Sequence, residues 1–282
     1  MNSKELRADI ETLYFKSLGS SNIDCIVWLD AVKSILGINI DSINIDLFNM
    51  LVSEFNENHF SHSNIKHYGT IPSAISLYGL EKALLDKDLN NSLENIYYLS
   101  WVSDGAQILE FLLEFSLKNC SSSYKYIWHM IRMQNFLNGK YMLETLNKAV
   151  LIILSEKFNP LVYDYNQKIS WVDFLSKDFY AINDFLLYYT IYNSDLIRID
   201  LIQPLLVCKL LKLKACHDNN LKFNDKQIDL GRKWIFDYLY RIDKDMLNFD
   251  MIIFLNNVRS CLMLSDDELE KQYLWSYLNS RI

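Results

Sequence analysis

The strongest constraint on the fold is an apolar pattern with helical spacing on both sides of a turn at Asn138-Gly139. Before the turn the spacing predicts a helix over 124–137, with the serine hydroxyl groups at 121–123 as candidate N-caps. After the turn, apolar residues recur every three or four positions over 142–154, which is too wide a stripe for a surface helix. Asn and Gly readily adopt positive φ and let the chain reverse. The sequence therefore predicts a central, buried helical hairpin.

The same spacing continues along most of the chain. It predicts helices over 3–18, 24–36, 45–55, 72–85, 91–118 and 245–264. Further helices are predicted over 178–192, 200–216, 224–242 and 265–279. A break in the helix over 91–118 is expected at Asp104-Gly105, and an extended connector at 38–45, where isoleucine alternates with polar residues. Only 7 Gly and 3 Pro are present, which suits helices joined by short loops. We expect an all-α fold of antiparallel helical hairpins, packed as a bundle or as a degenerate helical-repeat array.

The length of 282 residues suits one large domain or two small ones. We expect a single all-helical domain over 1–282. The alternative is a division into an N-terminal subdomain, 1–119, and a C-terminal subdomain of helical hairpins, 120–282.

Charge and cysteine usage restrict the partners and the compartment. The net charge is −7 and no basic cluster occurs, which disfavours nucleic acid and anionic membranes as ligands and favours a basic protein. The five cysteines are odd in number and show no CxxC spacing, so we expect reduced thiols in a cytoplasmic protein. No apolar run reaches the roughly 20 residues that span a bilayer. The expected oligomeric state is a monomer or a homodimer.

The sharpest chemical candidate is a polar loop that holds His59, His62 and His67, with Glu57 just before them. Imidazoles spaced three apart on a turn can share a divalent metal, so a helical metal-dependent or haem-type enzyme is one hypothesis. No catalytic motif completes this site, and a solvated loop is the competing interpretation. We expect no catalytic residue, no cofactor and a non-enzymatic protein. His129, between Trp and Met in the hairpin, is expected to be a hydrogen-bonded core residue.

A second candidate is an acidic, aromatic surface that binds a partner protein. Large aromatic side chains can anchor an interface by burial, while carboxylates steer a basic partner toward it. The competing interpretation is a solvated acidic face over a packed core. The predicted partner-binding residues are Tyr163, Asp164, Tyr165, Trp171, Asp173, Asp178 and Asp184.

The segments 171–190 and 201–214 resemble a pattern in all-helical immunity proteins of bacterial polymorphic-toxin systems. In that pattern a short segment with Leu, Lys and Asp opens a helix, and an apolar helix packs back on it. The matching residues here are Leu175, Lys177, Asp178, Phe185 and Leu186. The resemblance implies an acidic cytoplasmic protein that neutralises a cognate toxin by binding it.

One hairpin resembles a tetratricopeptide repeat through Trp128, Gly139 and Tyr141. It departs from that repeat at Glu144 and Leu151, where small residues are expected. This resemblance implies a third hypothesis, a helical-repeat scaffold that binds peptides.

Overall fold

The computed structural model describes residues 3–37, 42–57, 68–69, 75–119, 122–158 and 248–264. All regular elements in these ranges are helices, which confirms the predicted all-α class. The chain divides into two compact units, one formed by 1–30 and 50–162 and the other by 31–49 and 163–282.

The chain begins with two helices at the predicted positions. α1 (Ser3–Gly19) buries the predicted apolar stripe, Leu6, Ile10, Leu13 and Tyr14. α2 (Asp24–Leu36) begins after Asn22, whose side chain accepts a hydrogen bond from the Asp24 amide at 3.0 Å. It ends before Gly37, as predicted.

α3 (Ser42–Glu57) begins three residues earlier than predicted, so the prediction of extended backbone is wrong for residues 42–45. The remainder of the predicted connector, 38–41, lies outside the described residues. Leu47, Leu51 and Phe55 are fully buried and recur every four residues, which is a helical repeat. Ile43 continues the same repeat, and this outweighs the short alternation that suggested a strand.

α4 (Leu77–Leu85) begins later than the predicted start at Pro72, and residues 75 and 76 are not helical. Ser76 has extended backbone and its hydroxyl accepts a hydrogen bond from the Gly79 amide at 3.3 Å. This side-chain bond satisfies one of the amides left free at the first turn of a helix. Ser76 therefore sets the start of α4.

α5 (Leu89–Val102) and α6 (Gly105–Asn119) are separated where the sequence predicted a break. An aspartate precedes each helix. Asp88 Oδ1 accepts a hydrogen bond from the Asn91 amide at 3.0 Å, and Asp104 Oδ1 accepts one from the Ala106 amide at 3.0 Å. Aspartate side chains are among the best acceptors at helix starts, which explains why one long apolar pattern folds as two helices.

The predicted hairpin is confirmed as α7 (Ser123–Leu137) and α8 (Met142–Ser155). Asn138 and Gly139 adopt φ of 56° and 80°, so the turn forms as the sequence predicts. The N-cap Ser122 makes no side-chain capping bond, and the expectation of a hydroxyl cap for α7 is therefore wrong at this residue.

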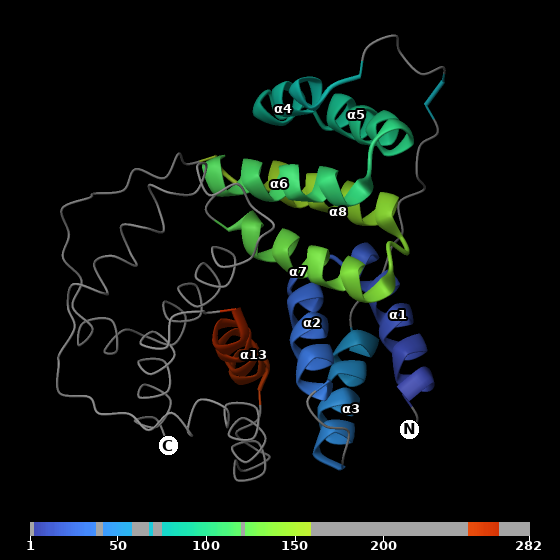
Figure 1. The fold of residues 1–282 in the computed structure, drawn as a ribbon, viewed down its shortest axis with the longest axis vertical. Helices are drawn as coiled ribbons and strands as arrows, with labels where there is room; N and C mark the ends of the chain where they lie inside the picture. The colour runs from blue at the N-terminus through green and yellow to red at the C-terminus, as the bar shows by residue number, and fades with distance from the viewer. Residues whose placement is uncertain are drawn as a thin grey trace, which may run out of the picture. The chain divides into compact units, whose positions relative to one another are not determined.

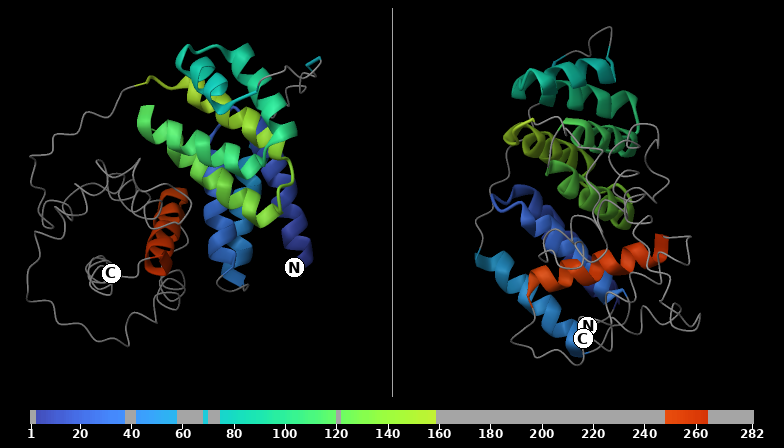
Figure 2. Two further views of the ribbon diagram at one scale, coloured as in Figure 1. Left: turned by 45° about the horizontal axis from the view of Figure 1, so that its top comes forward. Right: turned by 90° about the vertical axis from the view of Figure 1, so that its left-hand side faces the viewer.

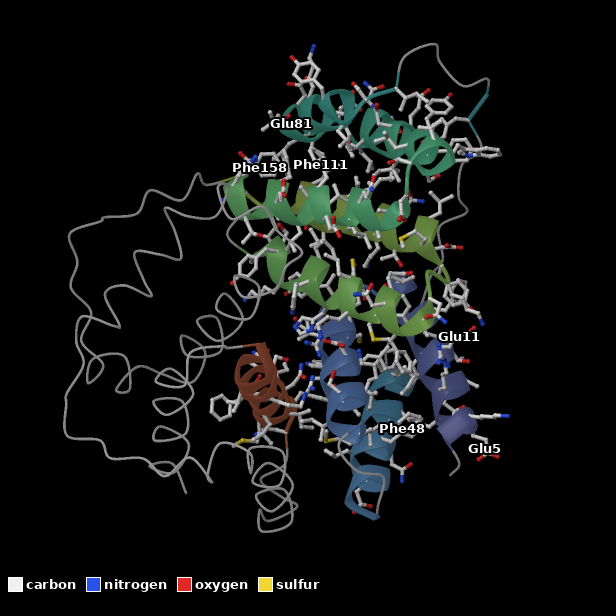
Figure 3. All side chains as sticks on the ribbon, in the orientation of Figure 1. Glu5, Glu11, Phe48, Glu81, Phe111 and Phe158 are labelled. Carbon is white, nitrogen blue, oxygen red and sulfur yellow. The ribbon has the colours of Figure 1, made fainter. Side chains whose placement is uncertain are left out.

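Tyr141 precedes α8 with a φ of 61°, a value that is uncommon for a residue other than glycine. Contacts from α1 hold this turn. The Tyr141 hydroxyl donates to Glu11 at 3.2 Å, its ring lies 4.8 Å from the ring of Phe15, and Lys140 pairs with Glu11 at 2.8 Å. Figure 3 shows Glu11 on α1 beside the end of α7. Hydrogen bonding to Lys140 is the main cause that lowers the pKa of Glu11.

α8 is the central helix of the first unit. It packs against α1, α4, α5, α6 and α7, and both α4 and α5 lie on it at one edge of the unit (Figures 1 and 2). Four core positions of α8, Leu146, Ala149, Val150 and Ile153, are fully buried. In a repeat array each pair of helices contacts mainly its neighbours, whereas here one helix contacts five others. The described part of this unit is a helical bundle.

In the second unit, the structure describes the end of α2, the beginning of α3, and α13 (Phe249–Leu264). Helix α13 buries Ile252, Leu255 and Val258, which recur every three residues. It begins after Asn248, whose side chain accepts a hydrogen bond from the Met251 amide at 2.9 Å, so the predicted helix is wrong at 248. The helices predicted over 170–242 and after 264 lie outside the described residues.

Substitution of Gly105 by alanine should destabilise the first unit. A Cβ at this position would overlap Cγ of Met142 and lie 2.9 Å from its sulfur, because the start of α6 approaches the start of α8 closely. Overpacking of this kind typically costs about 1–3 kcal/mol, and we expect a loss in that range by urea denaturation.

Gly69→Ala is the matched control, because a Cβ there meets no atom of the described residues within 4 Å. It should change the free energy of unfolding by less than about 0.5 kcal/mol. Equal stability of the two variants would show that α6 and α8 do not approach as the structure indicates.

Candidate protein-binding surface

All residues that the sequence predicts as sites lie outside the described ranges. They are His59, His62 and His67 for a metal, and Tyr163, Asp164, Tyr165, Trp171, Asp173, Asp178 and Asp184 for a partner. These sites remain predictions. Within the described ranges, no group of three or more His, Cys, Asp or Glu side chains is placed to hold a metal ion.

His129 is buried and hydrogen-bonded, as predicted. Its Nδ1 lies 2.7 Å from Oδ2 of Asp30, and Nε of Arg132 lies 2.8 Å from the same oxygen. His129 and Arg132 are three residues apart on α7, so both side chains reach α2. The Asp30 side chain is fully buried, and its charge is compensated by these contacts. This ionic group joins α2 to α7.

A second buried polar group joins α1, α7 and α8. The Tyr14 hydroxyl lies 3.0 Å from Oγ1 of Thr145, which also accepts a hydrogen bond from Nε2 of Gln134 at 2.5 Å. Thr145 donates to the carbonyl of Tyr141 at 2.8 Å. Burial raises the pKa of Tyr14 to about 12, so the phenol stays protonated at neutral pH. Because both polar groups are enclosed by the bundle, their geometry favours helix packing over contact with a ligand.

The exposed apolar side chains lie mainly on helices that carry neither of these buried polar groups. Among the described residues, the large hydrophobic side chains that face solvent gather on α4 and α5, with Leu151 of α8 as the exception. Those on α4 and α5 are Leu77, Tyr78, Leu85, Leu89, Trp101 and Val102. Tyr78 is 73% exposed and Trp101 is 64% exposed. Scattered exposed residues are ordinary, but six on one helix pair indicate a surface for another molecule.

An aromatic cluster supports the end of α5. The ring of Tyr97 lies 5.9 Å from that of Trp101, 5.5 Å from Tyr68 and 5.7 Å from Tyr98. Tyr97 and Tyr98 are buried, so the exposed indole rests on fixed rings. Desolvation, followed by hydrogen bonding to Glu94, raises the pKa of Tyr98. Glu94 therefore lies beside this cluster.

The helices that carry this surface are acidic. Between residues 75 and 119 the sequence has seven carboxylates and three lysines, and no Lys, Arg or His occurs from 88 to 117. Desolvation and the charges of Asp104 and Glu114 raise the pKa of Glu110, because like charges disfavour its ionised form. The ammonium group of Lys87 is held by other residues, because it donates to the carbonyl of Glu156 at 2.7 Å and lies over the ring of Phe158. Figure 3 labels Phe111 on α6 and Glu81 on α4, and the ring of Phe158 lies 5.8 Å from that of Phe115 on α6.

The sequence contains no local signal for this surface. In α5 the apolar residues at 96–99 occupy every side of the helix and all four are buried, whereas Trp101 and Val102 at its end are exposed. Composition alone could not show which side is exposed, because that depends on where α6 and α8 pack.

No protein-family model, curated protein or solved structure matches this chain. Among the described residues, no helix combines the length and the hydropathy needed to cross a lipid bilayer.

Removal of the buried charge of Asp30 should be costly. We expect Asp30→Asn to lower the free energy of unfolding by about 3–5 kcal/mol, because Arg132 loses its compensating carboxylate. The measurement is urea denaturation followed by circular dichroism.

Tyr126→Phe is the control on the same pair of helices. It removes a hydrogen bond to the exposed carboxylate of Asp24, at 3.0 Å, and should cost no more than about 1 kcal/mol. If Asp30→Asn costs as little as this control, Asp30 does not hold the two helices together.

Proposed function

We propose that this chain is a non-enzymatic protein-binding protein, an immunity protein that neutralises a cognate bacterial toxin in the cytoplasm. The observation that carries the proposal is the exposed apolar surface of α4 and α5, set among carboxylates. The resemblance of 171–190 and 201–214 to immunity proteins suggests the kind of partner.

The composition of the surface suits binding of a protein. Tyr and Trp are enriched among the residues that contribute most to interface affinity, because they bury a large area with few rotatable bonds. Tyr78 and Trp101 supply two such residues at exposed positions. Surrounding carboxylates add little affinity by themselves but favour encounter with a basic partner and disfavour an acidic one.

The interior supports the same proposal. The polar groups centred on Asp30 and on Tyr14 are buried, and their contacts join helices. Occlusion of a toxin needs a rigid surface rather than a reactive centre. A rigid bundle lowers the entropy lost when its surface binds, which favours affinity.

Two surfaces are therefore candidates for the contact. One is the described surface on α4 and α5, and the other comprises the predicted residues from Tyr163 to Asp184. Both are acidic and contain aromatic residues, so both fit a basic toxin domain.

The test is calorimetric titration with any basic toxin domain that a neighbouring gene encodes. We expect Tyr78→Ala combined with Leu85→Ala to raise the Kd by about tenfold or more, since an anchoring aromatic residue contributes about 2 kcal/mol. Charge reversal of Asp164, Asp173 and Asp178 to lysine tests the second surface with the same expected loss.

Leu151→Ala is the control, because this exposed side chain belongs to α8 and not to α4 or α5. It should leave the Kd within about twofold, in line with the small cost of most surface substitutions. Unchanged Kd values in both sets of variants, or no binding of the basic partner, would contradict the proposed function.

A further inference from the structure

The C-terminal end of α5 presents a single exposed aromatic ring in an acidic setting. Trp101 is the penultimate residue of α5, and Glu94 lies two turns before it on the same helix. Asp104 follows three residues later, at the start of α6. Positions seven apart fall on one face of a helix, so Glu94 and Trp101 share a face.

The indole of Trp101 is held in place yet accessible. One side rests against Tyr97, whose own ring is fixed by Tyr68 and Tyr98, while 64% of the Trp101 surface faces solvent. An aromatic ring with one free face and a fixed support can receive a flat group without losing much side-chain entropy.

The chain supplies little positive charge nearby in sequence. From 88 to 117 five carboxylates occur with no Lys, Arg or His, so α5 and α6 contain no cation apart from Lys118 near the far end of α6. Asp104 accepts a hydrogen bond from the Ala106 amide, which orients this carboxylate. Glu94 and Asp104 thus place negative charge before and after the exposed indole along the chain, which favours a cation on the ring face.

We propose that the exposed indole of Trp101 stacks on an arginine side chain of the partner, attracted by the carboxylates of Glu94 and Asp104. Arginine fits better than lysine, because its guanidinium is planar, is weakly hydrated and stacks on aromatic rings. The inference rests on the proposed function for the identity of the partner, but the arginine site itself can be tested without that partner.

The experiment uses the full chain labelled with ¹⁵N, in which each of the six tryptophans gives one indole resonance. The probe is a capped hexa-arginine peptide, with capped hexalysine and hexaglutamate as comparisons. Trp101→Phe identifies the Trp101 resonance by its disappearance. We expect this resonance to shift saturably with hexa-arginine, and the Kd for hexalysine to be at least about threefold higher, given the typical size of an exposed cation–π contact.

The double variant Glu94→Gln and Asp104→Asn tests the carboxylates. Glutamine has the shape of glutamate, and the amide oxygen of asparagine can still accept the hydrogen bond from the Ala106 amide, so the fold should be preserved. We expect the Kd for hexa-arginine to rise at least about threefold, as two exposed ion pairs would give. Asp9→Asn on α1 removes one exposed carboxylate from the same chain and should leave the Kd unchanged.

The inference is overturned if the Trp101 resonance does not move, if hexalysine binds as tightly as hexa-arginine, or if the double variant binds equally well. Its failure is distinct from failure of the proposed function. Loss of toxin binding in the Tyr78 and Leu85 variant, without an arginine effect at Trp101, would refute only the arginine site. Arginine binding at Trp101 without any toxin binding would refute only the immunity function.

Discussion

Burial of α8 is the interaction on which the first unit depends. It packs against α1, α4, α5, α6 and α7, and four of its apolar side chains are fully buried. Burial of a leucine or isoleucine side chain typically contributes about 1.5–3 kcal/mol, so a helix with several such residues at full burial dominates the stability of the unit. The polar group at Tyr14 joins α1 and α7 to α8, and the ionic group at Asp30 joins α2 to α7.

This arrangement explains why the proposed surface lies on α4 and α5. A helix pair at the edge of the bundle buries one side against α8 and α6, and its other side remains available. Aromatic side chains on that side lower the solubility of an isolated molecule, but they provide affinity when a partner covers them. The surplus of carboxylates over lysines in 75–119 keeps the surface hydrated and selects for basic partners.

The sequence predicts local features better than positions set by packing. The limits of α1 and α2 and the reversal at Asn138-Gly139 follow from apolar spacing and from residues with strong backbone preferences. The Ser76 hydroxyl marks the start of α4. Pro72 predicted an earlier start, because proline is favoured in the first turn of a helix.

Long-range contacts explain the remaining differences. The positive φ of Tyr141 follows from contacts with Glu11 and Phe15, which lie 130 and 126 positions earlier, and no local pattern encodes them. The partner of His129 was equally hidden, because Asp30 lies 99 residues away. Exposure of Trp101 likewise depends on the placement of α6 and α8. A surface site of this kind therefore has no motif, and the predicted residues between Tyr163 and Asp184 rest on composition alone.

Native-state amide hydrogen exchange tests the central place of α8 most directly. The account predicts that amides in the middle of α8 exchange only through global unfolding, with an opening free energy equal to that from urea denaturation. Amides of α4 should exchange through smaller openings, because this short helix lies at the edge of the unit. Exchange in α8 as fast as in α4, at an opening free energy well below the global value, would contradict the account.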